Sequence, residues 1–283
     1  MKLDQYSASK RMSMKDIQSV SLDILKFIAG ICEREGFRYS LMYGTLIGAV
    51  RHKGYIPWDD DVDIMMPRPD YEKFLRYAAT HHEEFGYYEI FNRDIQKDYL
   101  YSITRVSDSR YIIFKDDERN CGMGIFIDIY PYDGLGNDYN EAKEILTETK
   151  QTCNTIVDIT RKRLSLNNRM NIKGKISYLL THFKNKLKGV DYFIRKLEEN
   201  VAPYSYDTSD YVGPAMWFFT KPEKVLFKKD LFEELIKLPF EDGMFYAPSR
   251  YAELLTQEYG DYMQLPPEEK RIYQHQYLAY KKI

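Results

Sequence analysis

The sequence predicts an α+β protein, in which a mixed β-sheet core is flanked by helices and joined by a helical insertion and a helical C-terminal part. Two patterns lead to this fold class. Apolar residues recur at helical spacing after Ser13 and across residues 141–200, whereas short β-like runs alternate with turns between Tyr87 and Tyr130. With 283 residues, of which 44% are hydrophobic, the chain can form a substantial core.

The first predicted element is a helix that starts after Ser13. Ser13 and Asp16 have the spacing of a capping box, and Gly36 suits the residue that follows a helix C-terminus. Apolar residues at helical intervals between them predict that one face of this helix packs against the sheet. We assign this helix no chemistry.

A strand, a small-residue turn and a short helix are predicted next. Phe37 to Tyr43 reads as the strand, Gly44-Thr45 as the turn, and Leu46 to His52 as the helix. Free backbone N–H groups point outward at a helix N-terminus, so this arrangement can bind an anion such as phosphate. Taken alone, Gly-Thr before a helix is more often a plain turn.

Four carboxylates then precede an apolar run. If Val62 to Met66 is a strand, the side chains of Asp61 and Asp63 lie on one face, because strand residues alternate between faces. Two adjacent carboxylates repel unless a divalent cation neutralises them, and oxygen ligands favour Mg²⁺, with Mn²⁺ as the alternative. An isolated Asp-x-Asp is more often a solvated turn. An anion site close by favours metal-dependent phosphoryl transfer.

A helix from Tyr71 to about Phe85 and four β-like runs follow, and the last run contains a further acid. In Gly124 to Tyr130, Asp128 is the single charged residue of an apolar strand. A buried carboxylate is costly unless it is paired or binds a metal. A buried ion pair with Arg105 is one explanation. A third metal-binding carboxylate beside Asp61 and Asp63 is the interpretation we prefer.

Residues 161–188 contain nine Lys or Arg and no Asp or Glu. Apolar residues are interleaved with these charges: Leu164, Leu166, Ile172, Ile176, Leu179, Leu180, Phe183 and Leu187. A solvated helical insertion is the interpretation we favour slightly. The alternative is an amphipathic surface that lies against anionic lipid.

Aromatic side chains and bulk charge bear on the ligand and on the location of the protein. Trp58 and the cluster around Trp217 either pack the core or surround a quaternary ammonium group through cation–π contacts. The net charge of −2 lacks the basic bias of a nucleic-acid binder. Because no signal peptide and no membrane-spanning run is evident, we expect a cytoplasmic protein, in peripheral contact with the inner face of the cell membrane if residues 161–188 bind lipid.

Several runs of residues together resemble the LicD/fukutin family of phosphotransferases, which belong to the nucleotidyltransferase-fold superfamily. The similarity is densest over residues 40–75 and covers most of the chain, although residues 145–215 match weakly. The matching runs are YGTLIGAVRHKGYIPWDDDVDI from Tyr43, Met66-Pro67-Arg68, Tyr71 to Phe74, Phe126 to Gly134, Tyr259 to Met263, and Leu265-Pro266-Pro267.

The resemblance implies a substrate class that the residues alone do not give. It implies a CDP-alcohol donor, typically CDP-choline, whose phosphocholine passes to a sugar hydroxyl of a surface glycan, such as a lipopolysaccharide or teichoic acid precursor, with release of CMP. The acceptor would then be a glycan or a lipid-linked glycan. The residues themselves indicate only metal-dependent phosphoryl or nucleotidyl transfer.

Roles for individual residues follow as hypotheses. Asp61, Asp63 and Asp128 would hold one or two Mg²⁺, and Asp128 could instead accept the proton of the attacking hydroxyl. The predicted substrate-binding residues are Gly44, Thr45, Arg51, His52, Lys53, Trp58 and Trp217. Asp59 and Asp60 are either partners of the metal ligands or solvated.

Three alternatives to phosphocholine transfer remain open. The enzyme could be a nucleotidyltransferase that releases pyrophosphate, or it could transfer another CDP-linked alcohol phosphate such as ribitol or glycerol phosphate. It could also be a non-catalytic binding protein on a transferase fold. The domain organisation that we expect is a nucleotidyltransferase-like catalytic core over residues 1–140, a mainly helical insertion over 141–212 that faces a membrane or the acceptor, and a C-terminal part over 213–283 that completes the same domain and pocket.

Overall fold

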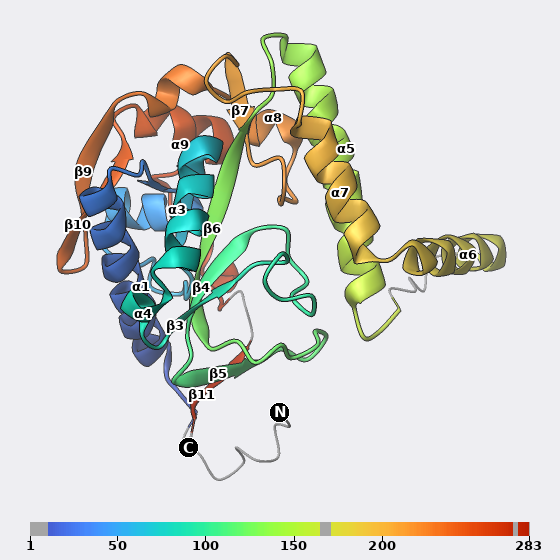
Figure 1. The fold of residues 1–283 in the computed structure, drawn as a ribbon, viewed down its shortest axis with the longest axis horizontal. Coiled ribbons are helices and arrows are strands. Elements are labelled where there is room, and N and C mark those ends of the chain that lie inside the picture. The colour runs from blue at the N-terminus through green and yellow to red at the C-terminus, as the bar shows by residue number, and fades with distance from the viewer. Residues whose placement is uncertain (1–10, 165–170, 274–276, 283) are drawn as a thin grey trace.

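A computed structural model describes residues 11–164, 171–273 and 277–282, and confirms the α+β fold class (Figure 1). The helices are α1 (Met14–Glu35), α2 (Tyr43–Ile47), α3 (Arg68–Thr80), α4 (His82–Phe85), α5 (Tyr139–Thr160), α6 (Ile172–Lys188), α7 (Val190–Val201), α8 (Pro222–Val225) and α9 (Tyr251–Tyr259), with a π-helical turn at Gly48–His52 and 3₁₀ turns at Lys229–Phe232 and Glu268–Lys270. The strands are β1 (Ser40–Leu41), β2 (Asp63–Pro67), β3 (Tyr88–Phe91), β4 (Thr104–Asp108), β5 (Tyr111–Phe114), β6 (Ile125–Gly134), β7 (Tyr211–Gly213), β8 (Phe227–Lys228), β9 (Leu235–Phe240), β10 (Gly243–Pro248) and β11 (Leu278–Lys281).

The central sheet is mixed, as predicted. Its strands run in the order β1-β2-β6-β4-β3, and β7 and β8 extend it from the far end of β6. β2 and β6 are parallel, while the other pairs in this sheet are antiparallel. Two-stranded pairs, β9 with β10 and β5 with β11, lie beside it. The long strand β6 therefore lies at the centre of the sheet and pairs with three strands, β2, β4 and β7.

Helices α1 and α3 pack against the central sheet, as their apolar faces predict (Figure 1). The predicted capping box is present, because Ser13 Oγ accepts from the N–H of Asp16 and the Asp16 carboxylate accepts from the N–H of Ser13. Gly36 ends α1 in the left-handed conformation, with φ of 73°. Ile24, Leu25 and Ile28 are fully buried between α1 and the sheet.

The segment between β1 and β2 differs from its prediction. The strand is limited to Ser40–Leu41, and the helix begins at Tyr43, so Gly44 and Thr45 belong to its first turn instead of a preceding turn. The hydroxyl of Thr45 accepts from the N–H of Asp63, at 2.8 Å. This long-range contact joins α2 to the start of β2, and it fixes where Asp63 emerges.

Other boundaries also shift. The helix predicted from Tyr71 to about Phe85 begins at Arg68 and divides at His81 into α3 and α4. Strand β6 continues to Gly134 and therefore includes a second acid, Asp133, whose carboxylate is paired with Arg68 at 2.6 Å.

Helices α5 and α7 pack side by side around a second, smaller group of buried apolar side chains, and α6 extends away from them (Figure 1). This second group also includes Met216 and Trp217 from the C-terminal part of the chain. Part of the basic segment, residues 165–170 with the apolar Leu166, lies outside the described residues. Across the described helices, none combines the length and hydropathy needed to cross a membrane.

Two glycines give a direct test of this packing. A Cβ at Gly124, which precedes β6, would lie 2.0 Å from the backbone oxygen of Asp108, whereas a Cβ at Gly30 in α1 would meet nothing within 4 Å. We expect Gly124→Ala to lower the free energy of unfolding by about 1–3 kcal/mol, because the backbone must move. Gly30→Ala should raise it by about 0.5–1 kcal/mol through helix propensity. Urea unfolding measures both free energies. Equal effects of the two substitutions would contradict the placement of β6 against β4.

Candidate active site

A cavity of about 520 Å³ opens where β2, β4 and β6 face α5 and the C-terminal part of the chain. Acids, bases and aromatic rings share its wall. The residues that line it are Tyr43, Asp61, Asp63, Tyr101, Arg105, Lys115, Glu118, Asp128, Tyr130, Asn154, Val157, Arg161, Trp217, Phe218, Phe219, Thr220, Val225 and Glu258. Larger cavities exist among the described residues, but this one contains all three predicted catalytic acids, so we take it as the candidate active site.

The parallel pairing of β2 and β6 brings two of the acids together. Asp63 and Asp128 are register partners in neighbouring strands, and both side chains are more than nine-tenths buried. Asp61 lines the same cavity, two residues before β2 begins. Burial, and then the charges of Asp61, Asp128 and Asp59, raise the pKa of Asp63 well above its ordinary value. The cavity therefore brings together carboxylates whose negative charges disfavour one another.

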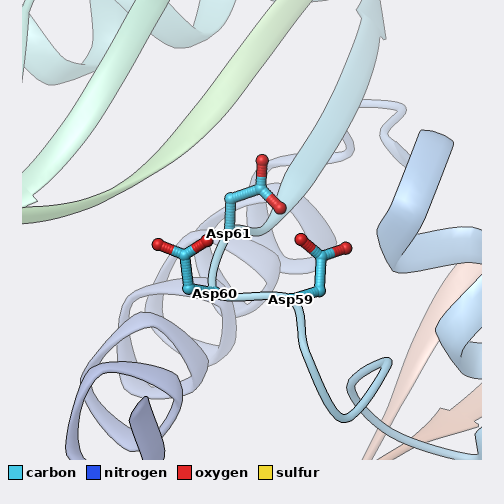
Figure 2. Close-up of side chains that lie close together, drawn as sticks. All are labelled: Asp59, Asp60 and Asp61. Carbon is cyan, nitrogen blue, oxygen red and sulfur yellow. The ribbon is translucent and has the colours of Figure 1, made fainter. Parts of the chain in front are cut away.

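Three consecutive carboxylates stand at the entrance to β2. Oxygen atoms of Asp59, Asp60 and Asp61 all approach within 4.8 Å of one another, and Figure 2 shows Asp61 between its two neighbours. Asp60 is buried, and its charge raises the pKa of Tyr277 after the larger effect of burial. A Cβ at Gly44 would lie 2.6 Å from Oδ2 of Asp59. The carboxylate of Asp59 therefore already lies against the first turn of α2, where the sequence predicted a phosphate.

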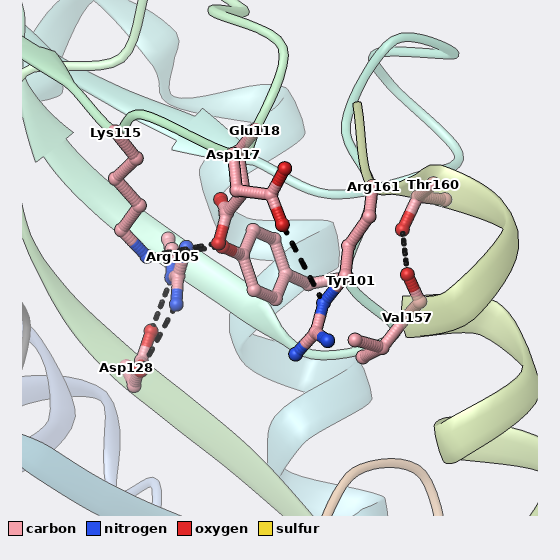
Figure 3. A network of polar contacts seen from close by, with 9 residues as sticks. All are labelled: Tyr101, Arg105, Lys115, Asp117, Glu118, Asp128, Val157, Thr160 and Arg161. Carbon is pink, nitrogen blue, oxygen red and sulfur yellow. Dashed lines mark hydrogen bonds and ion pairs between the residues drawn. The ribbon is translucent and has the colours of Figure 1, made fainter. Parts of the chain in front are cut away.

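Asp128 takes part in the ion pair that we had considered as its alternative role. Nε of Arg105 lies 2.5 Å from Oδ1 of Asp128, and Nη2 lies 3.4 Å from Oδ2 (Figure 3). The guanidinium also covers the ring of Tyr101 at 3.7 Å. Its Nη1 is buried without a hydrogen-bond partner, although Arg105 lines the cavity. Arg105 thus has a hydrogen-bond donor left for an anionic ligand.

Aromatic and charged groups form the opposite wall. Rings of Tyr101 and Trp217 meet edge to face at 5.3 Å, and Trp217 and Phe219 at 5.0 Å. The Tyr101 hydroxyl contacts Glu118 and accepts from Lys115, at 3.1 Å for the latter (Figure 3). Trp217 is 8% exposed, so it both packs in the second apolar group and reaches the cavity.

Several residues predicted to bind substrate are placed elsewhere by the structure. Trp217 lines the cavity, whereas the following do not: Gly44, Thr45, Arg51, His52, Lys53 and Trp58. Nη1 of Arg51 donates to the carbonyl oxygen of Tyr262 at 2.7 Å, and the His52 ring meets Trp58 edge to face. Arg51 therefore connects the π-helical turn to the C-terminal loop, and His52 connects it to the loop before β2. The basic residues of the cavity are instead Arg105, Lys115 and Arg161.

Sequence reasoning missed Glu258, near the end of α9. Its exposed fraction is 6%, and it lines the cavity. Its Oε2 has no hydrogen-bond partner. Burial raises its pKa to about 8. The signal available in the sequence was an acid next to Tyr259-Gly260, a run that carries the family resemblance.

The donor set fits a divalent cation. Carboxylates from Asp61 and Asp63 line one cavity. Burial and the charge of Asp61 disfavour the ionised form of Asp63, and oxygen is the ligand that Mg²⁺ prefers. Asp128 fits less simply, because Arg105 already compensates its charge.

Comparison with known proteins assigns the chain to a family. A family model described as LicD/FKTN/FKRP, nucleotidyltransferase domain, matches residues 36–157. The lipopolysaccharide cholinephosphotransferase LicD of Haemophilus influenzae is 32% identical over 276 residues, which cover 96% of this chain and 99% of that protein. The chain belongs to the LicD family. The resemblance stated from the sequence is thereby confirmed.

Other relatives match shorter stretches. An uncharacterised protein of Rickettsia prowazekii is 34% identical over 84 residues, 30% of this chain and 31% of that protein. The human ribitol 5-phosphate transferase FKRP is 49% identical over 39 residues, which are 14% of this chain and 8% of that protein.

The acid pair of β2 and β6 predicts opposite effects of two similar substitutions. Asp63→Asn should stabilise the metal-free protein, because it removes a buried carboxylate that other carboxylates repel. Asp128→Asn should destabilise it by about 3–5 kcal/mol, because it leaves buried Arg105 unpaired. Thermal melts in EDTA measure both effects. A gain in stability for Asp128→Asn would show that Asp128 is not the main partner of Arg105.

Glu258 predicts a pH dependence. Its folded pKa of about 8 exceeds the ordinary 4.5, so the folded state holds the proton more tightly than the unfolded state does. Its contribution to stability is therefore complete below about pH 4.5 and lost as the pH rises to 8, at no more than about 1.4 kcal/mol per pH unit. Glu258→Gln stays neutral and should lose less stability over this window. Parallel curves of unfolding free energy against pH for the two proteins would contradict the assignment.

Proposed function

We propose that this protein transfers phosphocholine from CDP-choline to a sugar hydroxyl of a cell-surface glycan precursor and releases CMP. The observation that carries the proposal is the cavity, which combines Asp61, Asp63 and Asp128 with the unpartnered N–H of buried Arg105. The similarity to a lipopolysaccharide cholinephosphotransferase over nearly the whole of both chains supports the choice of phosphocholine and of a glycan acceptor.

The reaction requires an anion site and a proton acceptor. The hydroxyl oxygen of the acceptor bonds to the phosphorus that carries choline, the bond from that phosphorus to the oxygen of the CMP phosphate breaks, and CMP leaves with the electron pair. Arg105 would donate from Nη1 to a phosphate oxygen, whereas Arg51, His52 and Lys53, which the sequence predicts as substrate-binding, do not line the cavity. Asp128 or Glu258 would accept the hydroxyl proton, since both line the cavity.

Mg²⁺ is proposed as the cofactor, with Mn²⁺ as the alternative. Asp61 and Asp63 would hold it, with Asp128 as a third ligand if Arg105 shares this carboxylate. When bound, the cation neutralises and positions the diphosphate of the donor. The carboxylates of Asp61 and Asp63 also repel each other, and a bound cation would relieve this repulsion.

The aromatic wall suits the choline head group. Trp217 and Phe219 meet edge to face, with an interplanar angle of 89°, and both line the cavity, where the face of an aromatic ring attracts a quaternary ammonium group. One face of Tyr101 is already covered by Arg105, so we propose the first two rings as the cation–π contacts. Glu118 adds a negative charge beside them.

A second candidate is transfer of ribitol phosphate, which the short, 49% identical match to FKRP favours. The two candidates differ in the donor alcohol alone, and both release CMP. A nucleotidyltransferase would release pyrophosphate instead, and a binding protein would release neither.

Product analysis tests the proposal. The protein is incubated with Mg²⁺ and, separately, CDP-choline, CDP-ribitol, CDP-glycerol or CTP, together with a glycan acceptor. We expect CMP from CDP-choline. Pyrophosphate from CTP, or CMP from CDP-ribitol alone, would replace the proposal by the corresponding alternative.

Two carboxamide variants test the catalytic acids. Asp61→Asn and Asp63→Asn should each lower kcat/KM by about a thousandfold or more, which corresponds to about 4 kcal/mol of transition-state stabilisation. Each keeps the side-chain volume and removes the charge. Glu269→Gln, which neutralises an exposed acid, is the matched control and should keep full activity. Near-normal turnover of either aspartate variant in Mg²⁺ would exclude it as a metal ligand.

A further inference from the structure

Helix α6 exposes a continuous apolar stripe. Its five outward apolar side chains follow one another at intervals of three or four residues and, on an ideal helix, span about 80° of arc. Their exposed fractions are far above those of core residues: Ile172 78%, Ile176 52%, Leu180 68%, Phe183 56% and Leu187 89%. A stripe of this size exposed to water is unfavourable and is typical of a surface that meets an apolar partner.

The orientation of this stripe is fixed by polar contacts on the opposite side of α6. The Tyr178 hydroxyl donates to Oδ1 of Asp158 at 2.6 Å, and Nδ1 of His182 lies 2.8 Å from Oδ2 of the same residue. Asp158 belongs to α5, and His182 is the buried residue of α6. Because these contacts hold one face of the helix against α5, the apolar face points away from the protein.

Lysines flank the stripe on both sides. On the helical wheel, three follow one edge of the stripe and two follow the other, and α6 contains no acid. These lysines are Lys173, Lys184 and Lys188 on one edge, and Lys175 and Lys186 on the other. An apolar stripe between two rows of cations matches the interface of an anionic bilayer, in which acyl chains lie beneath negatively charged head groups.

We propose that α6 is a membrane-docking helix, which lies in the surface of an anionic lipid bilayer with its apolar stripe inserted and its lysines among the head groups. A helix of 17 residues is about 25 Å long, too short and too charged to span the bilayer, so it lies in the plane. A second copy of the chain is the less suitable partner, since two such helices would bring like charges together.

A basic cavity at the base of α6 supports the same orientation. It has a volume of about 570 Å³, and its charged lining consists of one acid and six bases: Asp98, Arg93, Lys97, Arg119, Arg161, Lys162 and Lys186. Lys186 belongs to α6, and Arg161 also lines the candidate active site. The basic cavity therefore adjoins both the docking helix and the candidate active site. Docking itself does not depend on the proposed function.

Vesicle co-sedimentation tests the proposal. We expect the full chain to sediment with vesicles of phosphatidylglycerol and phosphatidylcholine at low salt, to bind pure phosphatidylcholine much more weakly, and to dissociate as NaCl shortens the Debye length. Changing Lys173, Lys184 and Lys188 to Gln should weaken binding by about 100-fold, because each lysine near an anionic leaflet contributes about 1 kcal/mol.

The apolar part has its own variants and controls. Leu180→Gln with Leu187→Gln should weaken binding comparably, whereas Met244→Gln with Ile272→Gln, which alters exposed apolar residues elsewhere, should not. Lys15, Lys228 and Lys270 changed to Gln form the matched charge control. In a Phe183→Trp variant, the fluorescence of the new indole should shift to the blue on addition of anionic vesicles.

Three results would overturn the proposal. One is the absence of sedimentation with anionic vesicles at low salt. Another is equal sedimentation of the α6 variants and their controls. The third is a dimer in analytical ultracentrifugation that Leu180→Gln with Leu187→Gln dissociates, because it would identify a second copy of the chain as the partner of the stripe.

Discussion

The candidate site depends on a single pairing, the parallel alignment of β2 with β6. It places Asp63 beside Asp128 in a buried position, where two carboxylates repel each other strongly. Arg105, from the antiparallel neighbour β4, compensates one of them and leaves the other with a raised pKa. The sheet thereby places two carboxylates beside one guanidinium, whose Nη1 has no hydrogen-bond partner.

Features determined by residues close together in the chain could be predicted from the sequence. The capping box of α1, the left-handed Gly36, the mixed sheet and the carboxylates of β2 and β6 all follow local patterns of period and polarity. The strand before Gly44 was the exception. There, the contact of Thr45 with Asp63 favours a helix that starts at Tyr43, and local propensity cannot anticipate a partner eighteen residues away.

The basic and polar residues of the cavity could not be predicted for a similar reason. Arg51 was a reasonable candidate because it follows the predicted anion site, yet the π-helical turn directs it to the carbonyl of Tyr262. Arg105, Arg161 and Glu258 come from three distant segments, and the fold alone brings them together. The anion site predicted at Gly44 already has the carboxylate of Asp59 beside it.

Charge segregation connects the site with the rest of the molecule. The chain is nearly neutral overall, yet nine of its cations lie within residues 161–188 without an acid, so the remainder is acidic. An acidic protein is repelled by an anionic surface unless its cations face that surface together. Five of these cations lie on α6, and Arg161 and Lys162 line the adjacent cavity, so these seven favour one orientation. Arg161 lines both cavities, so it lies where the basic cavity beside α6 adjoins the cavity that contains the carboxylates of β2 and β6.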